Sequence, residues 1–427
     1  MKAAPNQAEG TDPAAERETI AQRWALLRSN LAALPRPVWI LFVGTFVNRF
    51  GTFVLPFLAI YMTRRGFSVG ETSLAFLAYG AGNFCASMLG GYLADRIGRR
   101  NTIVLSMTGA AISLMGLSQA ESLEAIVAMA GLVGLTGELY RPACGALLAD
   151  LVPAELRVTA FATYRLAINA GWAFGPATAG FLAERSFFWL FAADAVTSAI
   201  FGLVALAALP HGFRSRGEAS QWSVVLRAIC RDRRFLQVLA ANFLVGLIFF
   251  QMSSTYGLHL QGMGYETSTY GLLISLNGLL IVFMELPLTT ITQRYPVRRV
   301  MAVGFVLLGG GFAVNAVAGG IPMLAVAMAI FTFGEMICMP VAAAYIANLA
   351  PTDLRGRYMG LFGFTFSLAM ITGPPVGMTL FHWNPVWLWL GCGLMGVLAA
   401  AIILPTVENG SEPVPELGEE AGKAVQG

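Results

Sequence analysis

The chain is built from apolar runs long enough to cross a membrane, separated by short charged loops, and this pattern constrains the fold most. Of 427 residues, 56% are hydrophobic and 12% are charged, whereas a soluble domain carries about 25% charged residues. A helix needs about 20 apolar residues to cross the hydrocarbon layer. The sequence therefore predicts an all-α polytopic membrane protein and excludes an ordinary soluble enzyme. Twelve spans are predicted, at residues 37–62, 70–94, 102–119, 124–150, 159–183, 187–210, 235–261, 267–292, 300–318, 321–349, 358–381 and 386–405.

The basic residues predict which loops face the cytoplasm. If both tails are cytoplasmic, the inside segments hold 21 of the 27 Lys and Arg residues, and the outside loops hold 3. Cytoplasmic loops are enriched in these residues, so both termini are expected inside. Residues 1–36 form a polar tail without a secretory signal, and residues 406–427 an acidic tail expected to be disordered.

Two further classes of protein are excluded. The net charge of +3 comes from 27 basic and 24 acidic residues, too even a balance for a nucleic-acid binder. The five cysteines are scattered and mostly lie inside apolar runs, so they indicate neither a disulfide framework nor a metal site. No cofactor or metal is expected.

An internal repeat divides the spans into two sets of six. Residues 37–210 and 235–405 form the predicted halves, joined by a polar cytoplasmic linker at 211–234 that is expected to include a surface helix. A shift of 198 residues aligns Pro142 with Pro340, Asp150 with Asn348, Pro153 with Pro351, Leu156 with Leu354, Arg157 with Arg355, Gly175 with Gly373 and Pro176 with Pro374. Duplicated halves around a mid-membrane site are the architecture of an alternating-access carrier.

The loop after the second span carries the most specific motif, GYLADRIGRR at residues 91–100. It resembles the loop GxLaDrxGrr of the major facilitator superfamily, and this resemblance extends over nearly the whole chain. In that family the loop acts as a cytoplasmic gate, so Asp95 is implied to stabilise one access state through charge and helix-dipole contacts. The second-half counterpart at 293–299 keeps the basic residues but lacks the acid, which implies an asymmetric gate. The implied gate residues are Gly91, Asp95, Arg96, Gly98, Arg99 and Arg100.

The fourth span contains Glu138 and Arg141, which are neighbours on one helix face. Arg141 and Gly145 resemble the superfamily motif RxxqG, with Cys144 in place of the usual Gln. Each charge near the middle of the bilayer costs about 2.5–3.5 kcal/mol. The functional interpretation is that Glu138 accepts a proton and Arg141 tunes its affinity; the alternative is a pair that is merely neutralised.

Three further acids lie inside spans. Glu335 in the tenth span is close to the repeat position of Glu138 and is the second candidate for protonation. Glu285 in the eighth span is interpreted either as a proton relay or as a structural partner of an arginine such as Arg294. Asp194 lies in the sixth span, which is peripheral in this family, and is expected to be structural.

The resemblance implies that spans 1, 4, 7 and 10 line the substrate cavity. Arg49, halfway through the first span, must face the cavity or a carboxylate such as Glu138 or Glu335. Mostly apolar walls with few polar anchors suit amphipathic molecules, although each aromatic residue here has packing as its alternative role. The predicted cavity residues are Asn48, Arg49, Phe249, Phe250, Gln251, Tyr256 and Asn277.

The fifth span resembles the antiporter motif GxxxGPxxGG, with Ala179 in place of one glycine. Small residues every fourth position permit close helix contact, and a proline bends the span. The motif implies exchange of protons for an outgoing solute; simple helix packing is the alternative. Its residues are Gly171, Gly175, Pro176 and Gly180.

These features predict a monomeric proton-coupled antiporter of a bacterial inner membrane, which exports hydrophobic or amphipathic small molecules. Its partners would be the substrate, protons and the lipid bilayer. A proton symporter for a sugar, peptide or organic anion is one alternative, with Arg49 and Arg141 binding a carboxylate. A membrane receptor or lipid scramblase without transport activity is the other.

Overall fold

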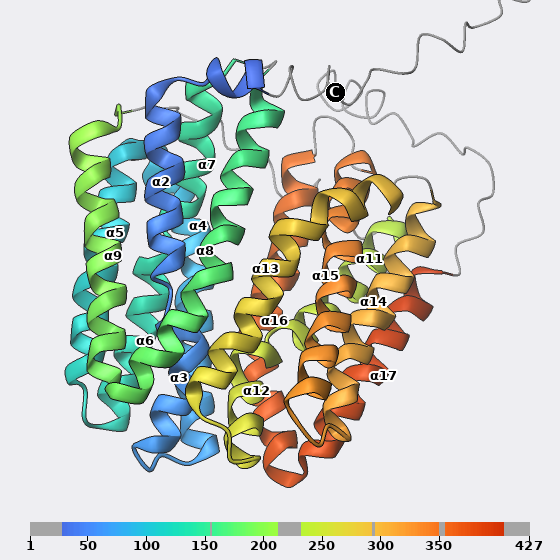
Figure 1. Cartoon of the computed structure of the whole chain (residues 1–427). Helices are drawn as coiled ribbons and strands as arrows, with labels where there is room; N and C mark the ends of the chain where they lie inside the picture. The colour runs from blue at the N-terminus through green and yellow to red at the C-terminus, as the bar shows by residue number, and fades with distance from the viewer. Residues whose placement is uncertain (1–27, 154–155, 212–231, 293–294, 350–354, 405–427) are drawn as a thin grey trace, which may run out of the picture.

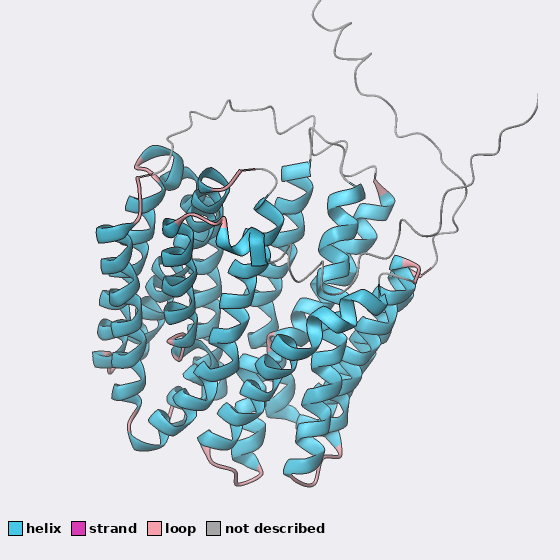
Figure 2. Ribbon diagram, turned by 45° about the horizontal axis from the view of Figure 1, so that its top comes forward, coloured by secondary structure: helices cyan, strands magenta, loops and turns pink. Residues whose placement is uncertain are grey.

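The computed structural model describes residues 28–153, 156–211, 232–292, 295–349 and 355–404, and this part of the chain is helical without strands (Figures 1 and 2). The first half contains α2 (Arg36–Phe50), α3 (Val54–Arg64), α4 (Val69–Arg96), α5 (Arg99–Gln119), α6 (Leu123–Glu138), α7 (Tyr140–Leu151), α8 (Arg157–Arg185) and α9 (Phe187–Ala208). The second half contains α11 (Arg233–Phe249), α12 (Gln251–Gly262), α13 (Thr267–Thr292), α14 (Val297–Ala313), the short 3₁₀ helix η3 (Val314–Ala316), α15 (Ile321–Leu349), α16 (Arg355–Trp383) and α17 (Pro385–Ile403). Both tails and most of the predicted linker lie outside the described residues.

Ten segments of the described chain are long and apolar enough to cross a membrane. Helices α4 and α8, with 28 and 29 residues, bring the set to the twelve predicted spans. These two helices pack across the molecule, α4 against α16 and α8 against α13. Large hydrophobic side chains such as Ile112, Leu203 and Phe283 are exposed on the outside of the bundle, as expected for a surface in contact with lipid.

Three predicted spans are each divided into two helices, which the apolar pattern did not reveal. The first span is α2 followed by α3, the fourth is α6 followed by α7, and the seventh is α11 followed by α12. A proline ring clashes with the carbonyl group four residues earlier. Pro56 and Pro142 therefore end the preceding helix near Thr52 and at Glu138. The repeat position Pro340 lies within α15, which continues through it.

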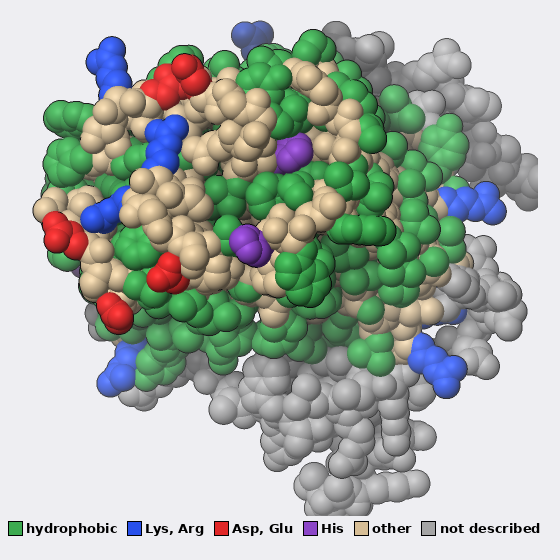
Figure 3. Space-filling model, turned by 90° about the horizontal axis from the view of Figure 1, so that it is seen from below, with side chains coloured by type: hydrophobic (Ala, Val, Ile, Leu, Met, Phe, Trp, Pro, Cys, Tyr) green, Lys and Arg blue, Asp and Glu red, His purple; other side chains and the backbone are tan. Residues whose placement is uncertain are grey.

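The two halves stand side by side in Figure 1, with α2 to α9 on the left and α11 to α17 on the right. We call the end where α2 begins and α17 ends the terminal face, and the end that carries the turns between α3 and α4 and between α12 and α13 the distal face. Figure 3 views the distal face, where the surface is continuous across the centre and the charged side chains gather over the first half.

The halves contact each other closely towards the distal face. Tyr270 of α13 donates a hydrogen bond from its hydroxyl to the carbonyl oxygen of Pro56 in α3, at 2.8 Å. The Ser268 backbone N–H donates to Glu184 Oε1 at 2.9 Å, which joins α13 to the end of α8. These contacts close the distal side of the interface between the halves.

Candidate functional site

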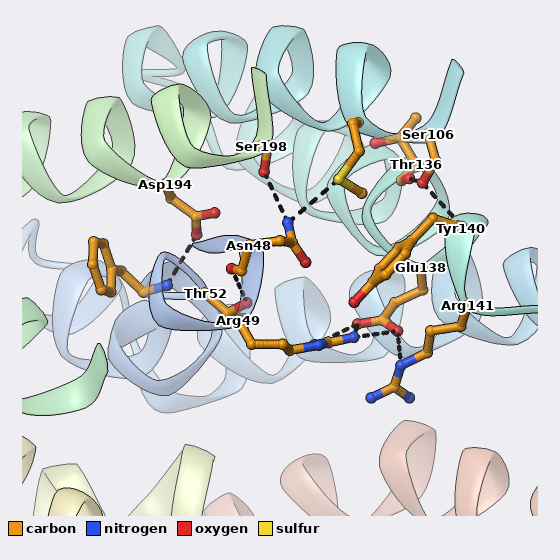
Figure 4. Close-up of polar contacts among 12 residues, drawn as sticks. Asn48, Arg49, Thr52, Ser106, Thr136, Glu138, Tyr140, Arg141, Asp194 and Ser198 are labelled. Carbon is orange, nitrogen blue, oxygen red and sulfur yellow. Dashed lines mark hydrogen bonds and ion pairs between the residues drawn. The ribbon is translucent and has the colours of Figure 1, made fainter. Parts of the chain in front are cut away.

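A buried carboxylate lies between two arginines at the break of the fourth span (Figure 4). Glu138 Oε2 accepts a hydrogen bond from Arg141 Nε at 2.8 Å. Arg49 Nη1 lies 3.4 Å from Glu138 Oε1, and the Arg49 guanidinium lies 5.4 Å from the ring centroid of Tyr140. The side chains of Arg49 and Glu138 are 4% and 11% exposed, whereas that of Arg141 is 54% exposed and points towards the second half. We call Arg49, Glu138 and Arg141 the charged triad.

Pro142 accounts for the local geometry of the triad. Because α6 ends at Glu138, the carboxylate sits at a helix terminus, and Arg141 lies in the first turn of α7. The two residues pair across the break, whereas the sequence analysis placed them on one face of a continuous helix. Arg49 lies in the last turn of α2. The sequence left open whether Arg49 pairs with Glu138 or with Glu335, and in the structure it pairs with Glu138.

The triad carries a net charge of +1 when all three groups are ionised. Removing one partner of a buried ion pair costs about 3–5 kcal/mol, because the other charge is left uncompensated. Protonation of Glu138 removes its negative charge in the same way and leaves Arg49 buried without an anion. Protonation of Glu138 is therefore costly in the arrangement described here.

A small polar cavity extends from the triad into the first half. It is lined by residues of α2, α3, α4, α5, α6 and α9, which include Asn48, Arg49, Tyr79, Glu138, Asp194 and Ser198. Its volume of about 30 Å³ admits one or two water molecules but no organic substrate. Buried Arg49 Nε has no hydrogen-bond partner within the described chain, and a water in this cavity would supply one. Asn48 Nδ2 donates to Ser198 Oγ at 3.4 Å, and its role as a substrate contact remains a prediction.

Glu335 lies in the second half, in the middle of α15, and is paired with an amide. Asn277 Nδ2 of α13 lies 2.8 Å from Glu335 Oε2 and 3.0 Å from Thr332 Oγ1. Asn277, which the sequence analysis assigned to the cavity, therefore holds the second candidate carboxylate in place. Its role as a substrate contact remains a prediction.

Glu285 of α13 connects the two halves. Its carboxylate pairs with the Arg165 guanidinium of α8, and Asn169 Nδ2 donates to Glu285 Oε2 at 3.3 Å. The predicted partner Arg294 lies outside the described residues. Arg165 is half exposed and Glu285 is mostly buried, so this ion pair bridges the halves on the terminal side of the interface.

The predicted cavity residues of the seventh span are largely buried in this conformation. Gln251 Nε2 donates to the carbonyl oxygens of Leu247 and Gly373, both at 2.9 Å. The ring of Tyr256 packs among aromatic residues that include Tyr270 and Trp389. Phe250 is buried and its ring contacts Phe249 edge-on and Phe366 at a tilt, while Phe249 is only partly buried. As substrate contacts, these four residues remain predictions.

The loop at residues 91–100 is organised around Arg99 rather than Asp95. Arg99 Nη1 lies 2.8 Å from Asp95 Oδ1, and Arg99 Nε lies 3.1 Å from Asp150 Oδ2 at the end of α7. Gly98 has φ 96° and precedes α5, a backbone conformation that favours glycine. Arg99 thereby ties α4, α5 and α7 together at the terminal face.

The other gate residues occupy the same loop. Arg96 Nη1 donates to the Tyr92 hydroxyl at 2.9 Å, and Arg100 Nη2 lies 2.5 Å from His211 Nε2. A Cβ at Gly91 would meet open space. In the second half, Arg298 Nη2 donates to the Tyr345 hydroxyl at 2.8 Å, so a tyrosine replaces the carboxylate there.

The glycines of the fifth span allow helices to approach α8 on two sides. A Cβ at Gly171 would lie 2.6 Å from Cβ of Arg49, and one at Gly175 would lie 2.5 Å from the carbonyl oxygen of Phe50. One at Gly180 would lie 2.8 Å from the carbonyl oxygen of Thr267 in the other half. Pro176 lies inside α8. The motif thus packs α8 against both the triad and the second half.

Comparison with known proteins places the chain in a family. The model of the Major Facilitator Superfamily matches residues 41–284 and 261–426. The chain is a member of the major facilitator superfamily. This superfamily member is 30% identical to the uncharacterized MFS-type transporter YttB of Bacillus subtilis, over 81% of its own length and 89% of that protein. It is therefore a multi-pass secondary transporter and not an enzyme.

Relatives of this superfamily member carry different functional names. It is 26% identical to the Na(+), Li(+), K(+)/H(+) antiporter of Planococcus maritimus, over 84% of its length and 92% of that protein. It is 24% identical to the multidrug resistance protein MdtH of Aeromonas hydrophila, over 86% and 94%. A crystal structure of a POT family transporter with a thioalcohol-conjugated peptide matches with a TM-score of 0.74 at 17% identity, over 87% of this chain and 96% of that one. At that identity the likeness concerns the fold.

Sequence reasoning missed several groups of the site. Asp150 appeared only as a repeat position, although it pairs with Arg99. Arg165 was noted inside a span, but its partner Glu285 lies 120 residues away. Tyr140 was passed over because an aromatic residue in a membrane helix is ordinary. Charges inside predicted spans were the signal that found Glu138 and Glu335, and the same signal singles out Arg165.

Proposed function

We propose that this transporter is a proton-coupled antiporter, which exports hydrophobic or amphipathic small molecules by alternating access. The observation that carries the proposal is the charged triad, in which one largely buried carboxylate holds two guanidinium groups at a break in a span. Such a cluster binds a proton only at the expense of its own pairing. Proton binding and helix rearrangement are therefore one event, as coupled transport requires.

We further propose that the terminal face is cytoplasmic and that the described conformation is closed to the outside. The excess of Lys and Arg in the loops at the terminal face supports this orientation. The contacts of Tyr270 with Pro56 and of Ser268 with Glu184 support closure at the distal face. In this state Glu138 is ionised and paired, which corresponds to a carrier that has released its proton inside.

In the proposed cycle, substrate enters from the cytoplasm and competes with the proton. When the carrier opens outwards, Glu138 takes up a proton and separates from Arg49, and substrate binding weakens. A change of one pKa unit between the two access states supplies about 1.36 kcal/mol of coupling. Glu335 is proposed as the second proton acceptor, and Glu285 with Arg165 as an ion pair that forms or breaks as the halves rock.

The name of the Planococcus Na(+), Li(+), K(+)/H(+) antiporter supports exchange with protons, and the name of the multidrug resistance protein MdtH supports a drug-like substrate. The partly apolar predicted cavity supports an amphipathic substrate. Import of an organic anion or peptide with protons is a second candidate, because the half-exposed guanidinium of Arg141 points towards the second half and suits a carboxylate. The alternative hypothesis, a receptor or lipid scramblase without transport activity, predicts no proton movement.

The test uses purified transporter in liposomes with an imposed pH gradient and a pH-sensitive dye, screened with amphipathic dyes and organic anions. With the wild type, substrate movement is expected to drive proton movement in the opposite direction. In Glu138→Gln, proton movement is expected to fall to the level of empty liposomes, while exchange of labelled for unlabelled substrate continues. Glu124→Gln, an exposed acid at the start of the same helix, is the matched control and should behave as wild type.

The direction of proton movement separates the candidates. Protons and substrate that move in the same direction would favour the symporter and contradict export by exchange. Unchanged proton coupling in both Glu138→Gln and Glu335→Gln would refute the assignment of these acids. If the wild type moved no protons with any substrate, the hypothesis of proton-coupled transport would be refuted.

A further inference from the structure

Asp194 of α9 holds the start of half-helix α3. This residue is 7% exposed, and its Oδ2 accepts a hydrogen bond from the backbone N–H group of Phe53 at 3.1 Å (Figure 4). It accepts a second one from the backbone N–H group of Val54 at 3.2 Å. The first N–H groups of a helix have no partner within the helix, and the helix dipole is positive at this end. The ionised carboxylate is therefore an anchor between α9 and α3.

Half-helix α3 forms part of the closed distal contact. Its Pro56 carbonyl oxygen accepts the hydrogen bond from Tyr270 of the second half. Ile60 packs against Gly257 of α12 so closely that a Cβ on this glycine would lie 2.9 Å from Ile60 Cδ1. The position of α3 therefore contributes to the closure of the distal face.

The small polar cavity connects Asp194 with the charged triad. The titratable or charged groups that face Asp194 across it are Arg49 on α2, Tyr79 on α4 and Glu138 on α6, while α5 contributes apolar side chains. Buried Arg49 Nε, which has no partner within the described chain, lines the same cavity. One or two waters fit there, and Asp194 and Glu138 both line the space that these waters would occupy.

We propose that Asp194 is a second proton-binding site, which receives a proton through the cavity water once the carrier has opened outwards, and thereby keeps α3 released and the distal face open. A cavity water gives one proton to Asp194 and regains one from protonated Glu138, which then takes up another proton from the outside medium, so two protons are bound in all. The neutral carboxylic acid loses its attraction to the positive helix end. This inference rests on the proposed function, because Glu138 must first bind a proton.

The test measures the opening of the distal face as a function of pH. Spin labels are attached through Arg64→Cys at the end of α3 and Gly262→Cys at the end of α12, with Cys85 and Cys230 replaced by serine. In the wild type, the distance between the labels is expected to increase as the pH falls. Asp194→Asn keeps an oxygen that accepts the N–H groups but carries no charge.

Asp194→Asn is therefore expected to show the long distance at pH values where the wild type is closed. The midpoint should move upwards by at least one pH unit, a ten-fold change in proton concentration. Asp194→Glu, which still titrates, should retain a pH-dependent transition and shows whether the site tolerates substitution. Glu124→Gln should follow the wild-type curve.

Two results overturn the inference in different ways. If Asp194→Asn follows the wild-type curve while Glu138→Gln still abolishes proton movement, Asp194 is only a structural cap and the proposed function stands. If the wild type moves no protons and its label distance does not depend on pH, both proposals fail.

Discussion

The stability of the charged triad can be tested by removing its charges one at a time. In Arg49→Met the buried Glu138 loses its least exposed partner, and Glu138→Gln leaves the Arg49 guanidinium, only 4% exposed, without an anion. Each change is expected to destabilise the protein by about 3 kcal/mol, as for other broken buried pairs. Arg141→Met should cost less than about 1 kcal/mol, because that side chain is half exposed.

The double variant Arg49→Met/Glu138→Gln removes both buried charges together. Its destabilisation is expected to be smaller than the sum of the single effects by about 1–3 kcal/mol, as for residues in direct contact. The assay is reversible unfolding in mixed detergent micelles, followed by helix content at pH 8, where Glu138 is expected to be ionised. Equal costs for Arg49→Met and Arg141→Met, or strictly additive effects, would refute the view that Arg49 and Glu138 are a mutually dependent buried pair.

Two further variants test packing around the site. Gly171→Ala places a Cβ 2.6 Å from Cβ of Arg49. This change should lower the stability of the protein by about 1–3 kcal/mol through overpacking and reduce proton coupling. The same change at Gly91, which faces open space, should be tolerated. Tyr270→Phe removes the hydrogen bond to Pro56 and should cost about 1 kcal/mol; thiol-labelling of a cysteine at the distal end of α3 should become faster, and an unchanged labelling rate would contradict its role in closure.

The sequence was sufficient to predict the twelve membrane-crossing segments, because a run of about 20 apolar residues between charged loops is typical of a transmembrane helix. It also located Glu138 and Glu335, since acids inside such runs are rare and costly. The division of the first and fourth spans into half-helices was missed, because hydropathy averages over both half-helices. Pro56 and Pro142, which cause these divisions, are nevertheless visible in the sequence.

The pairing of side chains from helices far apart in the chain could not be predicted from the sequence. Arg49 had Glu138, Glu335 and an anionic substrate group as possible partners, and only the packing of α2 against α7 selects Glu138. The role of Asp194 depends on a helix start 140 residues away. Gln251 and Tyr256 looked like cavity anchors because they are polar groups in a cavity-lining span, yet the close packing of α12 against its neighbours buries them here.

The central claim is that Glu138 changes its ionisation when the carrier changes its access state. Infrared difference spectroscopy of the reconstituted transporter can observe the C=O stretch of a protonated carboxyl group directly. Adding substrate at a pH where the outward-open, protonated carrier predominates should produce a negative carboxylic-acid band that is absent from Glu138→Gln and retained in Glu124→Gln. A band that persists in Glu138→Gln, or no band in the wild type while substrate is transported, would contradict the account.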